Sequence, residues 1–173
     1  MSRAYRVPAY EASATIEAED HLSMQLEMLD ILPPGEMVRM LREELKQEGW
    51  KETSDGEVEA VVGDARARLS ADGDRVTVER SEKNRVNVRG YNKDDVNKRL
   101  EQATTRAEDT AKKNVVRDLL RVEPEVRESI QRALQRVYVE ALKQKAKSMG
   151  DVESVREQRG ESGELELTIK VKV

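Results

Sequence analysis

The spacing of apolar side chains alternates between a period of two and a period of three to four along this chain. Between residues 10 and 30 nearly every second residue is apolar, which is typical of strands with one buried face. We expect two strands in this segment, joined as a hairpin around Glu19-Asp20-His21. After Leu32-Pro33-Pro34-Gly35 the spacing becomes helical. Pro34 suits a helix start and Gly49 a helix end, so a short helix is predicted between them, with Trp50 as a hydrophobic anchor.

From residue 51 to residue 92 the period of two returns, interrupted by glycine-containing turns. Asp55-Gly56, Gly63-Asp64 and Asp72-Gly73 supply the positive φ angles that tight hairpins need. The apolar positions between these turns predict a meander of four short antiparallel strands. They are centred on Val58/Ala60/Val62, Ala65/Ala67/Leu69, Val76/Val78 and Val86/Val88.

The next segment is helical, with an apolar or alanine residue at every third or fourth position. Asn92 is the expected N-cap of a first long helix, and Asp94 and Asp95 favour its first turn. Proline disfavours helix at the residue before it. We therefore expect Glu123-Pro124 to end the first helix, and a second one to continue to Gly150.

The end of the chain predicts a β-hairpin with its turn at Gly160-Glu161-Ser162-Gly163. The last strand alternates without interruption, with Leu165, Leu167, Ile169, Val171 and Val173 on one side. We expect this strand to belong to the main sheet, with its apolar side packed against the long helices.

These elements give the order β-β-α-β-β-β-β-α-α-β-β and the α+β class, a mostly antiparallel sheet packed against one short and two long helices. We expect a single domain over residues 1–173, which can be subdivided into a sheet-rich half (1–91) and a half with a helical hairpin and a β-hairpin (92–173). The interior must be aliphatic, because the chain has no Phe, one Trp and four Tyr.

The absence of cysteine excludes disulfides, thiolate metal sites and cysteine nucleophiles. No apolar run approaches the roughly 20 residues that cross a bilayer, and the N-terminus has no signal-peptide core. The expected location is the cytoplasm, with no membrane contact.

The sequence contains no recognisable catalytic set or cofactor motif. A single histidine, His21, has no second His or Cys to complete a zinc site, and is interpreted as an exposed turn residue. Asp72-Gly73-Asp74 resembles part of a calcium loop but lacks its remaining ligands, so a hairpin turn explains it better. No metal site and no cofactor are predicted, although paired carboxylates with a divalent cation stay an alternative.

Charge is unevenly distributed, with −6 over residues 1–90 and +2 over residues 91–173. The segment 11–30 has six acidic residues and no basic one, whereas the expected second long helix is rich in Arg and Lys. The two could attract each other within the fold or across a homo-oligomer, present two docking faces to a partner, or simply be solvated. The candidate interaction residues are Glu17, Glu19, Asp20, Arg132, Arg136 and Lys143.

Arg85, Arg89 and Tyr91 form a further cluster, at the end of an expected strand. A sheet surface that binds single-stranded nucleic acid needs stacking aromatics among its arginines. Only Tyr91 is available here, and the pI is near 5.4. Nucleic-acid binding is therefore the less favoured interpretation of this cluster.

Several short segments resemble a known family. The C-terminal third resembles the uncharacterised family of plastid and bacterial ycf-type proteins, in residues 136–150, the Val152-Glu153 pair and the final Leu165–Val171 strand. Two earlier segments resemble the same family, Leu45–Trp50 and Val88–Tyr91. Relatives of this kind are similar to accessory components found alongside FtsH-like AAA ATPases in bacterial gene clusters. The resemblance carries over no catalytic residue. It implies an accessory protein beside an AAA ATPase.

We therefore expect a non-enzymatic interaction or adaptor protein, with a protein partner such as an AAA ATPase. The alternatives are a divalent-cation-dependent enzyme that uses acidic residues and a weak binder of single-stranded nucleic acid.

Overall fold

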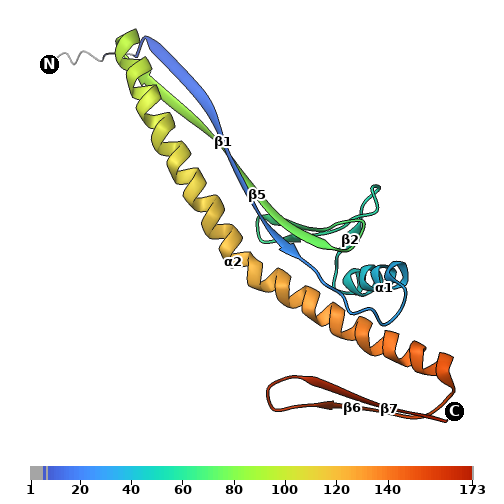
Figure 1. Ribbon diagram of the computed structural model, residues 1–173. Coiled ribbons are helices and arrows are strands. Elements are labelled where there is room, and N and C mark those ends of the chain that lie inside the picture. The colour runs from blue at the N-terminus through green and yellow to red at the C-terminus, as the bar shows by residue number, and fades with distance from the viewer. Residues whose placement is uncertain (1–5, 7, 173) are drawn as a thin grey trace. The chain divides into compact units, whose positions relative to one another are not determined.

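A computed structural model describes residue 6 and residues 8–172 of the chain, and it has the expected α+β class (Figure 1). The elements are β1 (Tyr10–Gln25), α1 (Pro34–Gln47), β2 (Lys51–Glu52), β3 (Val58–Val62), β4 (Ala65–Leu69), β5 (Arg75–Gly90), α2 (Lys93–Met149), β6 (Asp151–Arg159) and β7 (Leu165–Lys172). A five-stranded antiparallel sheet has the order β1-β5-β4-β3-β2, and β6 and β7 form a separate two-stranded sheet.

The chain is divided into two compact units, each made of segments that are far apart in the sequence. Unit 1 contains the described residues up to Leu22, Gly63–Ala65 and Val78–Val122. Unit 2 contains Ser23–Val62, Arg66–Thr77 and the residues from Glu123 onward. The strands β1 and β5 and the helix α2 each contribute residues to both units.

The core of unit 1 is thin and aliphatic. Asn92 caps α2 as expected, since its Oδ1 accepts a hydrogen bond from the Asp94 N–H over 2.8 Å. Gly90 leads into this cap, and a Cβ built on it would lie 2.7 Å from a methyl carbon of Val96. The lack of a side chain at Gly90 therefore allows the first turn of α2 to lie close to the end of β5. The buried apolar side chains of this unit are Ile16, Ala18, Ala65, Val78, Val88, Val96, Ala111, Val115, Leu119 and Val122.

In unit 2 the short helix α1 covers strands of the sheet. Its apolar positions Met37, Leu41 and Leu45 are buried. Gly49, at φ 96°, ends the helix as predicted, and the Trp50 N–H donates to the Leu45 carbonyl over 3.0 Å in the pattern of a Schellman cap. Trp50 is thereby turned inward and is only 4% exposed, so its predicted role as an anchor is confirmed.

The predicted hairpin at Glu19-Asp20-His21 is wrong, because β1 is one continuous strand of 16 residues. The even-numbered side is the more buried one both before and after Asp20. A turn in this segment would have changed that parity or required a residue with positive φ, and the described residues with positive φ are all glycines.

The predicted meander contains one strand too many. The expected strands at 76–78 and 86–88 are parts of β5, which runs unbroken for 16 residues. Arg80 lies between them on the same side of the strand as Val78. Its guanidinium is paired with Asp118 of α2, so the inward side of the strand continues through Arg80.

The predicted helix break at Pro124 is also wrong, because α2 is a single helix of 57 residues that contains this proline. Proline removes the N–H that would bond to the carbonyl four residues earlier, which belongs to Leu120. Both residues are exposed. Water can therefore hydrate the Leu120 carbonyl, which makes the proline tolerable within the helix.

The C-terminal hairpin forms as predicted, but it does not belong to the main sheet. Its turn has Gly163 at φ 88°, and Val155 pairs with Ile169 across the two strands. The apolar side of β7 is half-buried rather than buried. Alternation gives the side of a strand that is apolar, but not the element that covers it. Val173, the last expected member of the strand, lies outside the described residues.

Candidate functional site

Four charged side chains of unit 2 form a network of ion pairs between α1 and the second half of α2. Glu44 and Glu48 are one turn apart on α1, and Arg132 and Arg136 are one turn apart on α2, so each pair shares a helix face. Arg136 donates to Glu44 over 2.6 Å and to Glu48 over 2.8 Å, and Arg132 donates to Glu48 over 2.9 Å. We refer to these four residues as the α1–α2 ion-pair network.

The two arginines of the network offset the unfavourable interaction of Glu44 and Glu48 with the dipole of α1. Glu44 and Glu48 lie at the C-terminal end of α1, where the helix dipole disfavours negative charge. Hydrogen bonds from Arg132 and Arg136 lower the pKa of Glu48. Hydrogen bonds to Glu44 and Glu48 likewise raise the pKa of Arg136. Glu48 therefore stays ionised near neutral pH, which makes it a poor proton donor and suits it to holding the two helices together.

A cleft of about 600 Å³ adjoins the network within unit 2. It is lined by residues of α1, of the C-terminal part of α2 and of the β6–β7 hairpin. The hairpin follows α2 in the chain (Figure 1, orange to red). Lys143 of α2 bonds to Glu157 of β6 over 2.9 Å, which ties the hairpin to the helix. We call this space the hairpin cleft; its lining residues are Glu44, Arg132, Gln135, Arg136, Val139, Glu140, Glu157, Arg159 and Leu165.

The lining of the hairpin cleft combines apolar and charged groups. Val139 and Leu165 supply its apolar part and are half-buried. Glu140 and Arg159 are exposed charged residues of the lining. Mixed linings of this kind suit binding, with the apolar part providing affinity and the charges providing orientation.

Three of the predicted interaction residues are found at this place, and the others are not. Arg132 and Arg136 line the cleft, and Lys143 holds the hairpin beside it. Glu17, Glu19 and Asp20 lie on β1, in unit 1. Glu17 is 3.4 Å from Lys83 of β5, and Asp20 accepts a hydrogen bond from the His21 N–H.

The cluster of Arg85, Arg89 and Tyr91 is engaged with the N-terminal part of the chain. Arg85 donates to the Ser13 hydroxyl over 3.1 Å, and Arg89 pairs with Glu11 over 3.3 Å. The Tyr91 hydroxyl donates to the backbone carbonyl of Arg6 over 3.1 Å. Through these contacts the guanidiniums of Arg85 and Arg89 join β5 to β1 within unit 1.

Unit 1 contains a buried carboxylate that was not predicted from the sequence. Asp118 of α2 is 7% exposed, and its Oδ2 lies 3.5 Å from the Arg80 Nε. The exposed guanidiniums of Arg117 and Arg121 lie 3.7 and 3.6 Å from its Oδ1. The sequence contained one signal for this buried carboxylate. Asp118 directly precedes Leu119, which belongs to the apolar seam of the helix.

The glutamates of the network could have been found from the sequence, since Glu44/Glu48 and Arg132/Arg136 have the same four-residue spacing.

His21 is exposed, and Asp72-Gly73 forms a turn with Gly73 at φ 70°. In the described part of the chain, no three His, Cys, Asp or Glu side chains are grouped so that they could hold a metal ion. None of the described helices is long and apolar enough to cross a membrane.

Comparison with protein families gives a match over the whole chain. The model of the family described as FtsH ternary system domain X5 matches residues 1–173. The chain belongs to this family. The match supports the FtsH-linked part of the resemblance inferred from the sequence, and the ycf-type part stays a prediction. No curated protein and no solved structure matches this X5 domain.

Proposed function

We propose that this X5 domain is a non-enzymatic accessory protein that binds another protein of an FtsH-linked system. The observation that carries the proposal is the family match over residues 1–173. The proposed partner is an AAA ATPase of the FtsH type or a protein that acts beside it.

The chemistry of unit 2 supports a binding role. In the α1–α2 ion-pair network the carboxylate of Glu48 is held ionised by two guanidiniums, so it serves structure rather than proton transfer. The hairpin cleft, by contrast, exposes the charged groups of Glu140 and Arg159 beside half-buried apolar side chains. We propose that the cleft receives a polypeptide segment of the partner.

The decisive experiment is reconstitution with the FtsH-type protein encoded in the same host system. The purified proteins are mixed, and their association is measured by surface plasmon resonance. We expect the double variant Glu140→Lys/Arg159→Glu to weaken association by about tenfold or more, as loss of central interface contacts does. Glu166→Lys, an exposed change on the other side of β7, is the matched control and should bind like the wild type.

The outcomes separate the function from the site. If no protein of the FtsH-linked system binds, the proposed function is wrong. If the proteins bind and the double variant binds equally well, the function holds and the hairpin cleft is not the contact site. A rise in melting temperature on addition of Mg²⁺, Mn²⁺ or Ca²⁺ would instead favour the cation-dependent alternative, because a ligand of the native state stabilises it.

A further inference from the structure

The solvent side of α2 in unit 1 has two apolar side chains one turn apart. Val116 is 44% exposed and Leu120 is 63% exposed. Their neighbours Val115 and Leu119, about a quarter of a turn away around the helix, are buried. Single exposed apolar residues are common on protein surfaces, but an i, i+4 pair forms a short apolar ridge of the kind that packs against another helix.

Four cations lie beside this ridge. Lys112, Lys113, Arg117 and Arg121 are all exposed and lie within the same three turns. The one acidic residue between positions 112 and 121 is Asp118, which is buried and paired with Arg80. The exposed face formed by Lys112, Lys113, Val116, Arg117, Leu120 and Arg121, called here the 112–121 face, is therefore basic, although the chain has a net charge of −4.

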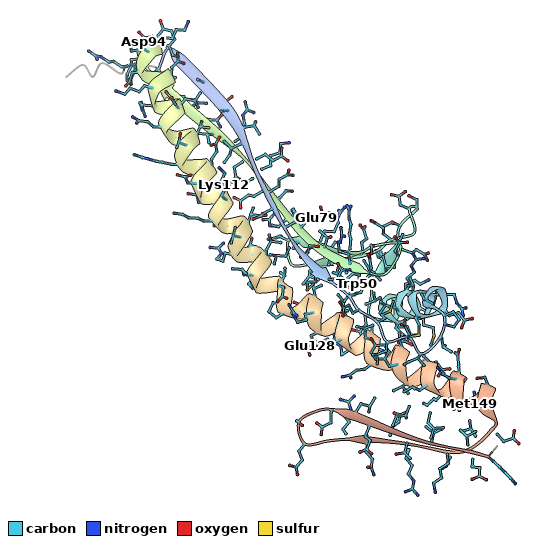
Figure 2. All side chains as sticks on the ribbon, in the orientation of Figure 1. Trp50, Glu79, Asp94, Lys112, Glu128 and Met149 are labelled. Atoms are coloured by element: carbon cyan, nitrogen blue, oxygen red, sulfur yellow. The ribbon has the colours of Figure 1, made fainter. Side chains whose placement is uncertain are left out.

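The four basic side chains of this stretch of α2 are exposed to solvent. Figure 2 labels Lys112 on the yellow part of the helix, where side chains with blue nitrogen tips point away from β1 and β5. Arg117 and Arg121 reach Asp118 with one edge and keep 70% and 66% of their side chains exposed. A guanidinium in that position retains donors for a second carboxylate.

We propose that the 112–121 face binds an acidic amphipathic helix of a protein partner. The apolar ridge of the partner would pack against Val116 and Leu120, and glutamates or aspartates on both sides of it would meet the four cations. Complementary charge fixes the register of such a pair and raises its association rate. The inference goes beyond the proposed function, because it assigns a different surface in the other unit and a chemistry to its ligand.

The test uses a synthetic helical peptide of about 20 residues, roughly 30 Å long, with leucines along one side and glutamates next to them. Binding to the full chain is measured by fluorescence anisotropy at low and at high salt. We expect binding that weakens with salt. It should weaken by about tenfold or more in Val116→Ser/Leu120→Ser and in Lys112→Glu/Lys113→Glu.

Two controls accompany these variants. Leu29→Ser changes another exposed leucine, located in unit 2, and should bind the peptide like the wild type. A peptide with lysines in place of the glutamates should not bind. Circular dichroism verifies that each variant of the protein is folded. Lys112→Glu/Lys113→Glu retains Val116 and Leu120, so this variant tests the charge of the face alone.

Several results would overturn the proposal. They are no binding of the acidic peptide, equal binding by all variants, and equal binding of the lysine peptide. Two further results would assign the 112–121 face differently. Binding to anionic phospholipid vesicles through the same residues, without peptide binding, would make it a membrane surface. Self-association that is lost in Val116→Ser/Leu120→Ser would make it an interface between two copies of the chain.

Discussion

The indole Nε1 of Trp50 donates a hydrogen bond to the Ser129 hydroxyl over 3.1 Å. This contact joins the residue that follows the α1 cap to the second half of α2 within unit 2. Trp50 is also the only tryptophan of the chain, so its fluorescence reports on the packing of this unit.

We expect Ser129→Ala to lower the free energy of unfolding by about 1–3 kcal/mol, because a buried donor then has no acceptor. Urea unfolding followed by tryptophan fluorescence measures this loss. Ser148→Ala, whose hydroxyl lies on the exposed last turn of α2, is the matched control and should change stability by less than about 0.5 kcal/mol. Equal effects of the two variants would show that the bond does not stabilise the unit.

The sequence predicted the elements whose ends have local chemical signals. Pro34 and Gly49 delimited α1, Asn92 began α2, and the Gly160–Gly163 turn placed the last hairpin. Each of these signals acts within a few residues, through a cap or a positive φ angle. Such features can be read from sequence because the physics that determines them is local.

The wrong predictions of strand and helix boundaries concern residues whose structural role depends on their environment in the folded chain. Val76/Val78 and Val86/Val88 were predicted as separate strands, because the sequence does not show that Arg80, between them, pairs with Asp118. Pro124 suggested a helix end, although its position on the solvent side of α2 makes it tolerable. The hairpin cleft was not predicted for the same reason, since Arg136 and Glu44 are 92 residues apart.

Asp118→Ala should destabilise the protein strongly, because it leaves the Arg80 guanidinium without its buried counter-charge. Breaking a buried pair costs about 3–5 kcal/mol, and the partial exposure of Arg80 makes the lower end of this range the expected value. Thermal unfolding by circular dichroism measures the loss. Arg117→Ala removes an exposed partner of the same carboxylate and should cost about 1 kcal/mol or less. A smaller loss for Asp118→Ala than for Arg117→Ala would contradict this interpretation.

Glu48 should make stability depend on pH in the acidic range. Its pKa is lowered in the folded state, mainly by the hydrogen bonds from Arg132 and Arg136. Its contribution is therefore present above the ordinary carboxyl pKa of 4.5 and is lost as the pH falls through the lower, folded value. Glu48→Gln should be less stable than the wild type at neutral pH, and this difference should shrink below about pH 4.5.

Urea unfolding of wild type and Glu48→Gln over a series of pH values measures this difference. Arg136→Gln serves as a second probe, because it removes one of the cations that lower the pKa. The pH dependence that Glu48 causes should be weaker in that background. A difference between wild type and Glu48→Gln that stays constant down to strongly acidic pH would exclude the predicted role of Glu48.

Pro124→Ala should stabilise α2, because residue 124 then has an N–H that can donate to the Leu120 carbonyl. Proline in a helix interior is about 3 kcal/mol less favourable than alanine. The gain should be smaller than this, since the wild-type helix already accommodates the proline. The melting temperature and the helical circular dichroism signal should both rise. A lower melting temperature would show that packing requires the local geometry of the proline.

Ile169→Asp should loosen the C-terminal hairpin without unfolding the rest of unit 2. Full burial of such a side chain contributes roughly 1.5–3 kcal/mol, and Ile169 is only half-buried, so the expected loss is about 1 kcal/mol. Hydrogen exchange should become faster in β6 and β7 and stay unchanged in α1. Faster exchange throughout α1 would show that the hairpin is part of the cooperative core.

The passage of β1, β5 and α2 through both units has a consequence for dissecting the protein. Because unit 1 and unit 2 are each assembled from separate stretches of the chain, no single cut yields either of them as one intact fragment. A cut after Val122, for example, leaves the first fragment with all of α1 but without the Arg132 and Arg136 that bond to it. Each unit can therefore be inherited, exchanged or engineered only together with the other.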